Sequence, residues 1–292
     1  MNNDINIASR AGLYSSLNKS YSSFQKDLMD IHNLHNSLPQ EIIAKYKIII
    51  GKQYLYNIFS TMEILLVDSA VNLLISYPGK IGNLKNDTDL LTEVSTLTGA
   101  IRYHAIKRIN ELSYKKPSEF IKEVYDMFGE KPGIGEDVFG KIIEGKATRD
   151  LYMHNNGKSN YVYFEKSGKY ARVKNDEEFL VLDEQYLADL KVAVEQLGND
   201  FKTKCIEKHI NDTPIMIFKK MWEMSALNRI VEFERQWIIK GRYVFISDLT
   251  WDWSGSEKAL FNFFKFIHGG KADGLNISDI PYALYRWKGQ VD

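Results

Sequence analysis

Hydrophobic residues recur along this chain at intervals that predict amphipathic α-helices. Between residues 13 and 36 they fall three or four positions apart, on one side of a predicted helix. These positions are Leu17, Tyr21, Phe24, Leu28 and Ile31. The pattern resumes at Pro39 and continues to Ser76, where Tyr77-Pro78-Gly79 predicts the end of a second helix. Further helices are predicted over residues 89–112, 119–128, 137–154 and 183–208, with Asp89, Ser118 and Asp183 as N-caps.

The periodicity changes after Gly157. Three short runs rich in aromatic and β-branched residues alternate with turn residues, which predicts short strands in a small β-hairpin insertion. The runs are 161–164, 170–173 and 179–182, and the turns are Ser167-Gly168-Lys169 and Asn175-Asp176. Beyond residue 210 we predict helices over 213–237, 256–267 and 277–287 and a strand at 242–246.

The 292 residues can form one large domain or two modest ones. All five tryptophans lie beyond residue 210, which marks a change in composition. We therefore predict a mainly α fold made of an N-terminal helix (1–39), a helical bundle with the hairpin insertion (40–208) and a small α-rich C-terminal domain (209–292).

Composition excludes several classes of protein. Hydrophobic residues make up 44% and aromatic residues 13% of the chain, enough for a packed core and too much for a disordered protein. The 38 basic and 38 acidic residues give a net charge of zero, so the chain lacks a basic coat for nucleic acid. Any contact with RNA must therefore be local, through a patch or a cleft between two copies.

A single cysteine, Cys205, excludes an intrachain disulfide and a cysteine-based zinc site. The first residues lack the basic and then apolar run of a secretory signal. The most apolar stretch, 58–75, is interrupted by Glu63, Asp68 and Asn72, which a membrane span tolerates badly. We expect a cytoplasmic protein with no membrane association.

The candidate chemistry lies in the segment from Arg149 to Lys158. Arg149 is a permanent cation whose forked donors suit a phosphate. Five residues later comes His154, and histidine is the side chain that can exchange a proton near neutral pH. Asn155-Asn156-Gly157 then predicts a helix end, because Asn and Gly tolerate the left-handed conformation. We expect Arg149 and His154 on roughly the same side of the helix, where they could cleave RNA through its own 2′-hydroxyl.

This segment resembles the signature of the HEPN superfamily, an all-α group rich in RNA-cleaving toxins and defence proteins. The family pattern is an arginine, a polar residue, about three variable residues and a histidine, matched here by Arg149, Asp150 and His154. The helix predicted over 60–68, with its exit at 77–80, and the segment after residue 160 extend the resemblance to about residues 40–200.

The resemblance implies a metal-independent endoribonuclease without a cofactor, with Arg149 and His154 as catalytic residues. It also implies a homodimer that brings two Arg/His pairs into one cleft, and products with 2′,3′-cyclic phosphate and 5′-hydroxyl ends. We see no metal-ligand cluster in the sequence. By analogy with the family, the protein is a toxin or phage-defence effector that acts on tRNA or mRNA and is held in check by an antitoxin, another regulatory protein or its own C-terminal domain.

Three further residues are candidates for supporting roles. Asp150 could orient His154 or Arg149, or form an ordinary helix salt bridge. Asn155 could position phosphate, although capping of the helix is favoured. Glu63, like Asp68, could reach the Arg/His pair, although a structural ion pair between helices is slightly favoured.

Two other classes of function stay open at this stage. The same pocket could hold RNA or a nucleotide without cleaving it. Alternatively, the helical bundle could serve only for dimerisation in an assembly protein. Sensitivity of RNA cleavage to His154 would separate the enzyme from both.

Overall fold

The computed structural model describes residues 12–82, 97–212, 237–240 and 243–246. The chain divides into two compact units, Met1–Ile210 and Asn211–Asp292. The described part of the first unit is mainly helical, as predicted. In the second unit the structure describes one antiparallel pair of strands, β1 (Trp237–Lys240) and β2 (Tyr243–Ile246). The strand predicted at 242–246 is therefore present, whereas Trp237 is in a strand rather than at the end of a helix. The helices predicted at 256–267 and 277–287, and the rest of 213–237, lie outside the described residues.

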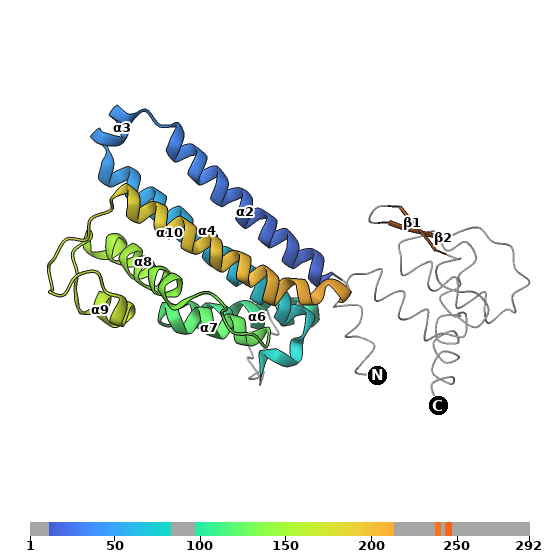
Figure 1. Cartoon of the computed structure of the whole chain (residues 1–292). Coiled ribbons are helices and arrows are strands. Elements are labelled where there is room, and N and C mark those ends of the chain that lie inside the picture. The colour runs from blue at the N-terminus through green and yellow to red at the C-terminus, as the bar shows by residue number, and fades with distance from the viewer. Residues whose placement is uncertain (1–11, 83–96, 213–236, 241–242, 247–292) are drawn as a thin grey trace, which may run out of the picture. The chain divides into compact units, whose positions relative to one another are not determined.

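The first unit is built on two long helices and their neighbours. Figure 1 shows α2 (Leu13–Ser37), α4 (Lys47–Ser76) and α10 (Glu184–Phe201) side by side, with α6 (Leu97–Ser113), α7 (Pro117–Met127) and α8 (Glu136–Asn155) along the bundle. Shorter helical segments complete the unit: α3 (Gln40–Lys45), η1 (Pro78–Ile81), α9 (Tyr161–Ser167), η2 (Gly168–Tyr170), the π-helical η3 (Lys202–Ile206) and η4 (Glu207–Asp212).

The predicted helix boundaries are confirmed in most places. The buried residues of α2 include four of the five predicted positions, and Ile31 is partly exposed. The helix predicted from Pro39 is interrupted at Tyr46, which separates α3 from α4. Helix α7 begins at Pro117, one residue before the predicted cap Ser118, because proline suits the first helical turn. Asp183 caps α10 as predicted, and its Oδ1 accepts a hydrogen bond from the backbone N–H of Tyr186 over 2.8 Å.

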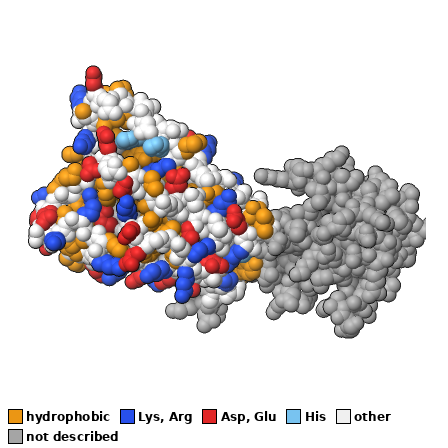
Figure 2. Space-filling model, in the orientation of Figure 1, with side chains coloured by type: hydrophobic (Ala, Val, Ile, Leu, Met, Phe, Trp, Pro, Cys, Tyr) orange, Lys and Arg blue, Asp and Glu red, His pale blue; other side chains and the backbone are white. Residues whose placement is uncertain are grey.

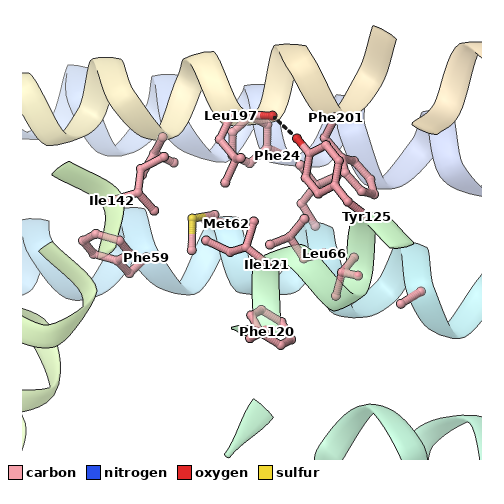
Figure 3. Packing of buried hydrophobic residues seen from close by; sticks show 14 of the residues in the cluster. Phe24, Phe59, Met62, Leu66, Phe120, Ile121, Tyr125, Ile142, Leu197 and Phe201 are labelled. Atoms are coloured by element: carbon pink, nitrogen blue, oxygen red, sulfur yellow. Dashed lines mark hydrogen bonds between the residues drawn. The ribbon is translucent and has the colours of Figure 1, made fainter. Parts of the chain in front are cut away.

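Helix α4 forms the centre of the unit. It packs against α2, α6, α7, α8 and α10, and apolar residues surround its axis. Figure 3 shows Phe59, Met62 and Leu66 of α4 inside the core, which Ile142 of α8 and Phe201 of α10 also line. By length and composition α4 could cross a membrane, a criterion that the core helix of a globular protein also meets.

The predicted β-hairpin insertion is wrong. Residues 161–167 form helix α9, because Asn160 caps it by accepting a hydrogen bond from the N–H of Tyr163 over 3.0 Å. Beyond η2 the chain runs without a regular strand and returns alongside residues 157–159, where Lys158 and Phe179 form an isolated antiparallel bridge. The alternation of residues suggested strands, whereas the segment forms a helix with Asn160 as its N-cap.

Candidate functional site

Helix α8 carries the candidate residues and ends where the sequence predicted. Its last helical residue is Asn155, and Asn156 adopts the left-handed conformation with φ 50°. Gly157 follows with φ 82°, and a Cβ there would meet the ring of Tyr152. The predicted helix stop is confirmed, and it places His154 in the exposed last turn.

Arg149 lies against α4 and is held by two carboxylates. Its Nη1 donates to Asp150 Oδ1 over 2.9 Å, and its Nη2 donates to Glu63 Oε2 over 3.2 Å. The side chain is 18% exposed. Its Nε is buried and has no hydrogen-bond partner in the part of the chain that the structure describes. The orientation of the guanidinium is therefore fixed by protein contacts before any ligand arrives.

Two lysines complete this group. Lys146 pairs with Glu63 and lies 3.8 Å from Asp150 Oδ1, and Lys166 of α9 donates to Asp150 Oδ2 over 2.7 Å. We call Glu63, Lys146, Arg149, Asp150 and Lys166 the Arg149 cluster. It contains three cations and two carboxylates, a formal charge of +1.

Asp150 is the residue that joins the cations. Burial alone would raise the pKa of its carboxyl group, yet the net shift is downward. The charge of Lys146 and the hydrogen bonds from Lys166 and Arg149 lower the pKa, so Asp150 is ionised at neutral pH. Asp150 contacts Arg149 and Lys166, and among the described residues it makes no hydrogen bond or ion pair with His154.

His154 stands apart from the Arg149 cluster. Its side chain is exposed and makes no hydrogen bond or ion pair within the described residues. Five residues along an α-helix correspond to a rotation of about 140°, so the expectation that His154 and Arg149 lie on roughly the same side was wrong. Arg149 points to α4, whereas His154 faces solvent.

The other candidates take different positions. Asn155 donates from Nδ2 to the carbonyl of Lys158 over 2.7 Å, a contact within the turn that follows α8, whose C-cap position is Asn156. Glu63 forms the ion pair between helices that the sequence favoured. Asp68 is exposed and makes no ion pair among the described residues. Tyr152 of α8, which is not one of the candidates, is buried and donates to the carbonyl of Leu180.

A second charged group on α8 escaped the sequence analysis. Glu144 is 3% exposed, and its carboxylate accepts four hydrogen bonds. The donors are Thr148 Oγ1 at 2.6 Å, Tyr163 Oη at 2.8 Å, Arg172 Nε at 2.9 Å and Tyr186 Oη at 2.7 Å. We call these five residues the Glu144 cluster. A glutamate between Ile143 and Gly145, amid apolar neighbours, was the one signal in the sequence that could have revealed it.

The Glu144 cluster fastens the segment after α8 onto the bundle. Tyr163 belongs to α9, Arg172 to the irregular chain beyond it and Tyr186 to α10. The guanidinium of Arg172 stacks 3.6 Å from the ring centre of Tyr186. Burial and the charge of Glu144 raise the pKa of both tyrosines, which therefore remain hydrogen-bond donors at neutral pH.

Three pockets of the described first unit have linings that include neither Arg149 nor His154. One of them, about 910 Å³, lies between α7 and the start of α8, and its lining mixes Lys122, Lys131 and Lys169 with acidic residues. A pocket of about 510 Å³ reaches the Glu144 cluster. Within the described residues no group of three or more His, Cys, Asp or Glu side chains could hold a metal ion.

Acidic and basic side chains are interspersed over the face of the first unit shown in Figure 2.

Comparison of the chain with protein-family models, with curated proteins and with solved structures finds no match.

Proposed function

We propose that this chain is a metal-independent endoribonuclease of the HEPN type. The observation that carries the proposal is the pair of contrasting side chains at the end of α8. Arg149 is a cation held rigidly by Glu63 and Asp150, while His154 is exposed with no partner among the described residues. The first is suited to a phosphate and the second to proton transfer.

The proposed reaction uses Arg149 and His154 of one chain, a second histidine from another copy of the chain, and the RNA itself. His154 removes the proton from a 2′-hydroxyl, whose oxygen attacks the adjacent phosphorus. Arg149 stabilises the negative charge of the phosphorane. The bond from phosphorus to the 5′-oxygen then breaks, and a second imidazolium protonates the leaving oxygen. The products carry a 2′,3′-cyclic phosphate and a 5′-hydroxyl.

A homodimer supplies the second imidazolium in this proposal. One chain offers a single His154, and it is turned about 140° from Arg149 on the helix. The histidine that completes the site is therefore His154 of the partner subunit. Large apolar side chains are exposed on α4 and α8, the helices that carry Glu63 and Arg149. Ile64 of α4 is 56% exposed and Met153 of α8 is 52% exposed. Burial of such side chains would favour association of two copies.

By analogy, the proposed setting is the cytoplasm, where the enzyme would cleave tRNA or mRNA as a toxin or phage-defence effector. Such an enzyme would need restraint by an antitoxin, another regulatory partner or the C-terminal unit. The zero net charge means that RNA is bound locally, near the Arg149 cluster, rather than over the whole surface.

A specific observation favours a second candidate. Because Glu63 and Asp150 already occupy both Nη atoms of Arg149, the Arg149 cluster could be purely structural. The chain would then be a non-catalytic RNA- or nucleotide-binding module, or an assembly protein that dimerises through exposed apolar residues such as Ile64.

The test is cleavage of total RNA and tRNA in excess EDTA by the wild type and by His154→Ala. We expect the variant to lose about 10²–10⁴-fold in rate, the contribution of a general acid or base, while its thermal unfolding and its oligomeric state are unchanged. His104→Ala, on α6, is the matched control and should cleave normally. Equal cleavage by the wild type and His154→Ala, or no cleavage by either, would contradict the proposal and favour the second candidate.

A further inference from the structure

The three cations of the Arg149 cluster differ in how far they face solvent. The side chain of Lys146 is 9% exposed, that of Arg149 18% and that of Lys166 32%. Lys146 and Arg149 both come from α8, whereas Lys166 comes from α9. The outermost positive charge is therefore supplied by the segment that was expected to be a hairpin.

These cations also differ in how firmly the carboxylates hold them. Lys146 pairs with Glu63 below the surface, and Arg149 is shared between Glu63 and Asp150. Lys166 has Asp150 as its one ion-pair partner among the described residues. Since the Arg149 cluster holds three cations and two carboxylates, its described members leave one excess positive charge, and Lys166 is the cation best placed to offer it to an anion from outside.

Lys166 lies in helix α9, which is anchored to the rest of the first unit. The buried Tyr163, one turn earlier on α9, donates to Glu144 of α8. Ser167, the next residue after Lys166, is also buried and donates to the carbonyl of Tyr163 over 2.6 Å. Placement of the backbone at Lys166 therefore carries little extra entropic cost when a ligand binds.

We propose that Lys166 is a second phosphate-binding residue, which contacts the RNA backbone beside the phosphate held by Arg149. Asp150 positions both cations, because one of its oxygens accepts from Arg149 and the other from Lys166. The carboxylate of Asp150 therefore bridges the two cations, with one hydrogen bond to each. This inference rests on the proposed function for the identity of the anion, an RNA phosphodiester.

A binding experiment tests the inference separately from catalysis. The probe is a fluorescently labelled single-stranded oligouridine with 2′-O-methyl riboses, which cannot be cleaved because the attacking hydroxyl is blocked. Its Kd is measured by fluorescence anisotropy over a range of salt concentrations for full-length wild type, Lys166→Ala, Lys166→Arg and Lys169→Ala. Lys169 is the matched control, because it lies three residues away and pairs with Glu136, outside the Arg149 cluster.

The slope of log K against log salt is negative, and loss of one phosphate contact should reduce its magnitude by about 0.7 for a single strand. We expect that change, with a several-fold weaker Kd, for Lys166→Ala, and wild-type values for Lys166→Arg and Lys169→Ala. If the wild type also cleaves RNA, Lys166→Ala should raise KM more than it lowers kcat, which a purely structural role would not produce.

The outcomes separate the two proposals. Wild-type Kd and slope in Lys166→Ala would overturn the role of Lys166, even if the wild type cleaves RNA. A weakened Lys166→Ala in a protein that binds the probe but never cleaves would sustain the role of Lys166 and contradict the ribonuclease. If the wild type does not bind the probe, that result alone overturns the proposed role of Lys166.

Discussion

Helix α8 carries two charged clusters that differ in almost every physical respect. The Glu144 cluster has one deeply buried carboxylate, one cation and three hydroxyl donors, so every oxygen of the glutamate is satisfied. The Arg149 cluster has three cations for two carboxylates and lies closer to solvent, and Arg149 Nε has no hydrogen-bond partner among the described residues. The first is balanced in charge and its carboxylate is fully hydrogen-bonded, and the second carries an excess positive charge.

The contrast separates a structural polar network from a candidate binding site. A buried carboxylate is tolerated only when its hydrogen bonds are complete, and completeness leaves it nothing to offer a ligand. An excess charge near the surface is the opposite arrangement, because an external anion can compensate it. We therefore expect substitutions in the Glu144 cluster to change stability, and substitutions in the Arg149 cluster to change RNA binding and cleavage.

The largest effect on stability is expected from Glu144→Ala. Removal of the carboxylate leaves Arg172 and two tyrosine hydroxyls without their partner, and breaking such a buried ion pair costs about 3–5 kcal/mol. Asp150→Ala should cost less, about 1–2 kcal/mol, because Lys166 can turn to water and Arg149 keeps Glu63. Urea titrations give the free energy of unfolding of both variants. Equal losses of stability would contradict the proposed difference between the two clusters.

A smaller effect is expected from Tyr186→Phe. The hydroxyl of Tyr186 donates to Glu144 Oε2 over 2.7 Å, and loss of this charged hydrogen bond should reduce the free energy of unfolding by about 1–3 kcal/mol. Tyr170→Phe is the matched control, because its hydroxyl lies 3.4 Å from the exposed Glu136 and should contribute almost nothing. Urea titration of the two variants under identical conditions gives the answer. An unchanged Tyr186→Phe would mean that water replaces the hydroxyl in the Glu144 cluster.

The smallest predicted effects concern the pH dependence of the free energy of unfolding. The Glu144 cluster should affect it at alkaline pH and the Arg149 cluster at acid pH. Burial and Glu144 raise the pKa of Tyr163 above its ordinary 10.0, so its contribution to stability is complete below pH 10 and declines as the pH rises further. The pKa of Asp150 lies below its ordinary 3.8, so its contribution is complete above that value and declines as the pH falls below it.

Unfolding free energies measured across the pH range test these signs. Tyr163→Phe should make the alkaline loss of stability shallower and leave the acid side as it is. Asp150→Asn should make the acid loss shallower and leave the alkaline side as it is. Crossed effects, such as an alkaline change in Asp150→Asn, would show that the two clusters are coupled through α8.

The sequence was sufficient for most of the helices and for the end of α8. Long amphipathic patterns identified α2, α4 and α10, because burial of one helix face imposes a periodicity that persists over many residues. It failed between 161 and 182, where the segment was too short for its periodicity to distinguish strand from helix. There the Asn160 cap and the hydrogen bond of Tyr163 to Glu144 decided the outcome.

For the candidate site, the sequence selected the residues but not their groupings. Arg149, Asp150 and Glu63 do come together, although Glu63 lies 86 positions from Arg149 and only its interruption of an apolar helix drew attention to it. Lys146 and Lys166 were not selected, because a lysine on a helix is usually exposed and carries no motif. Their roles depend on contacts between α4, α8 and α9.

The sequence by itself therefore determined the mainly helical fold of the described first unit, the end of α8 at Asn156-Gly157 and the presence of an arginine and a histidine on its last turns. These properties are local, because they depend on periodicity and backbone preferences over a few residues. Only the tertiary structure decided that Arg149 is clamped to α4 while His154 is left in solvent, and that α9 delivers Lys166 to Asp150. Such arrangements depend on which side chains, distant in the sequence, are buried together. The cost of burying their charges and the gain from pairing them are set by tertiary contacts and not by local sequence.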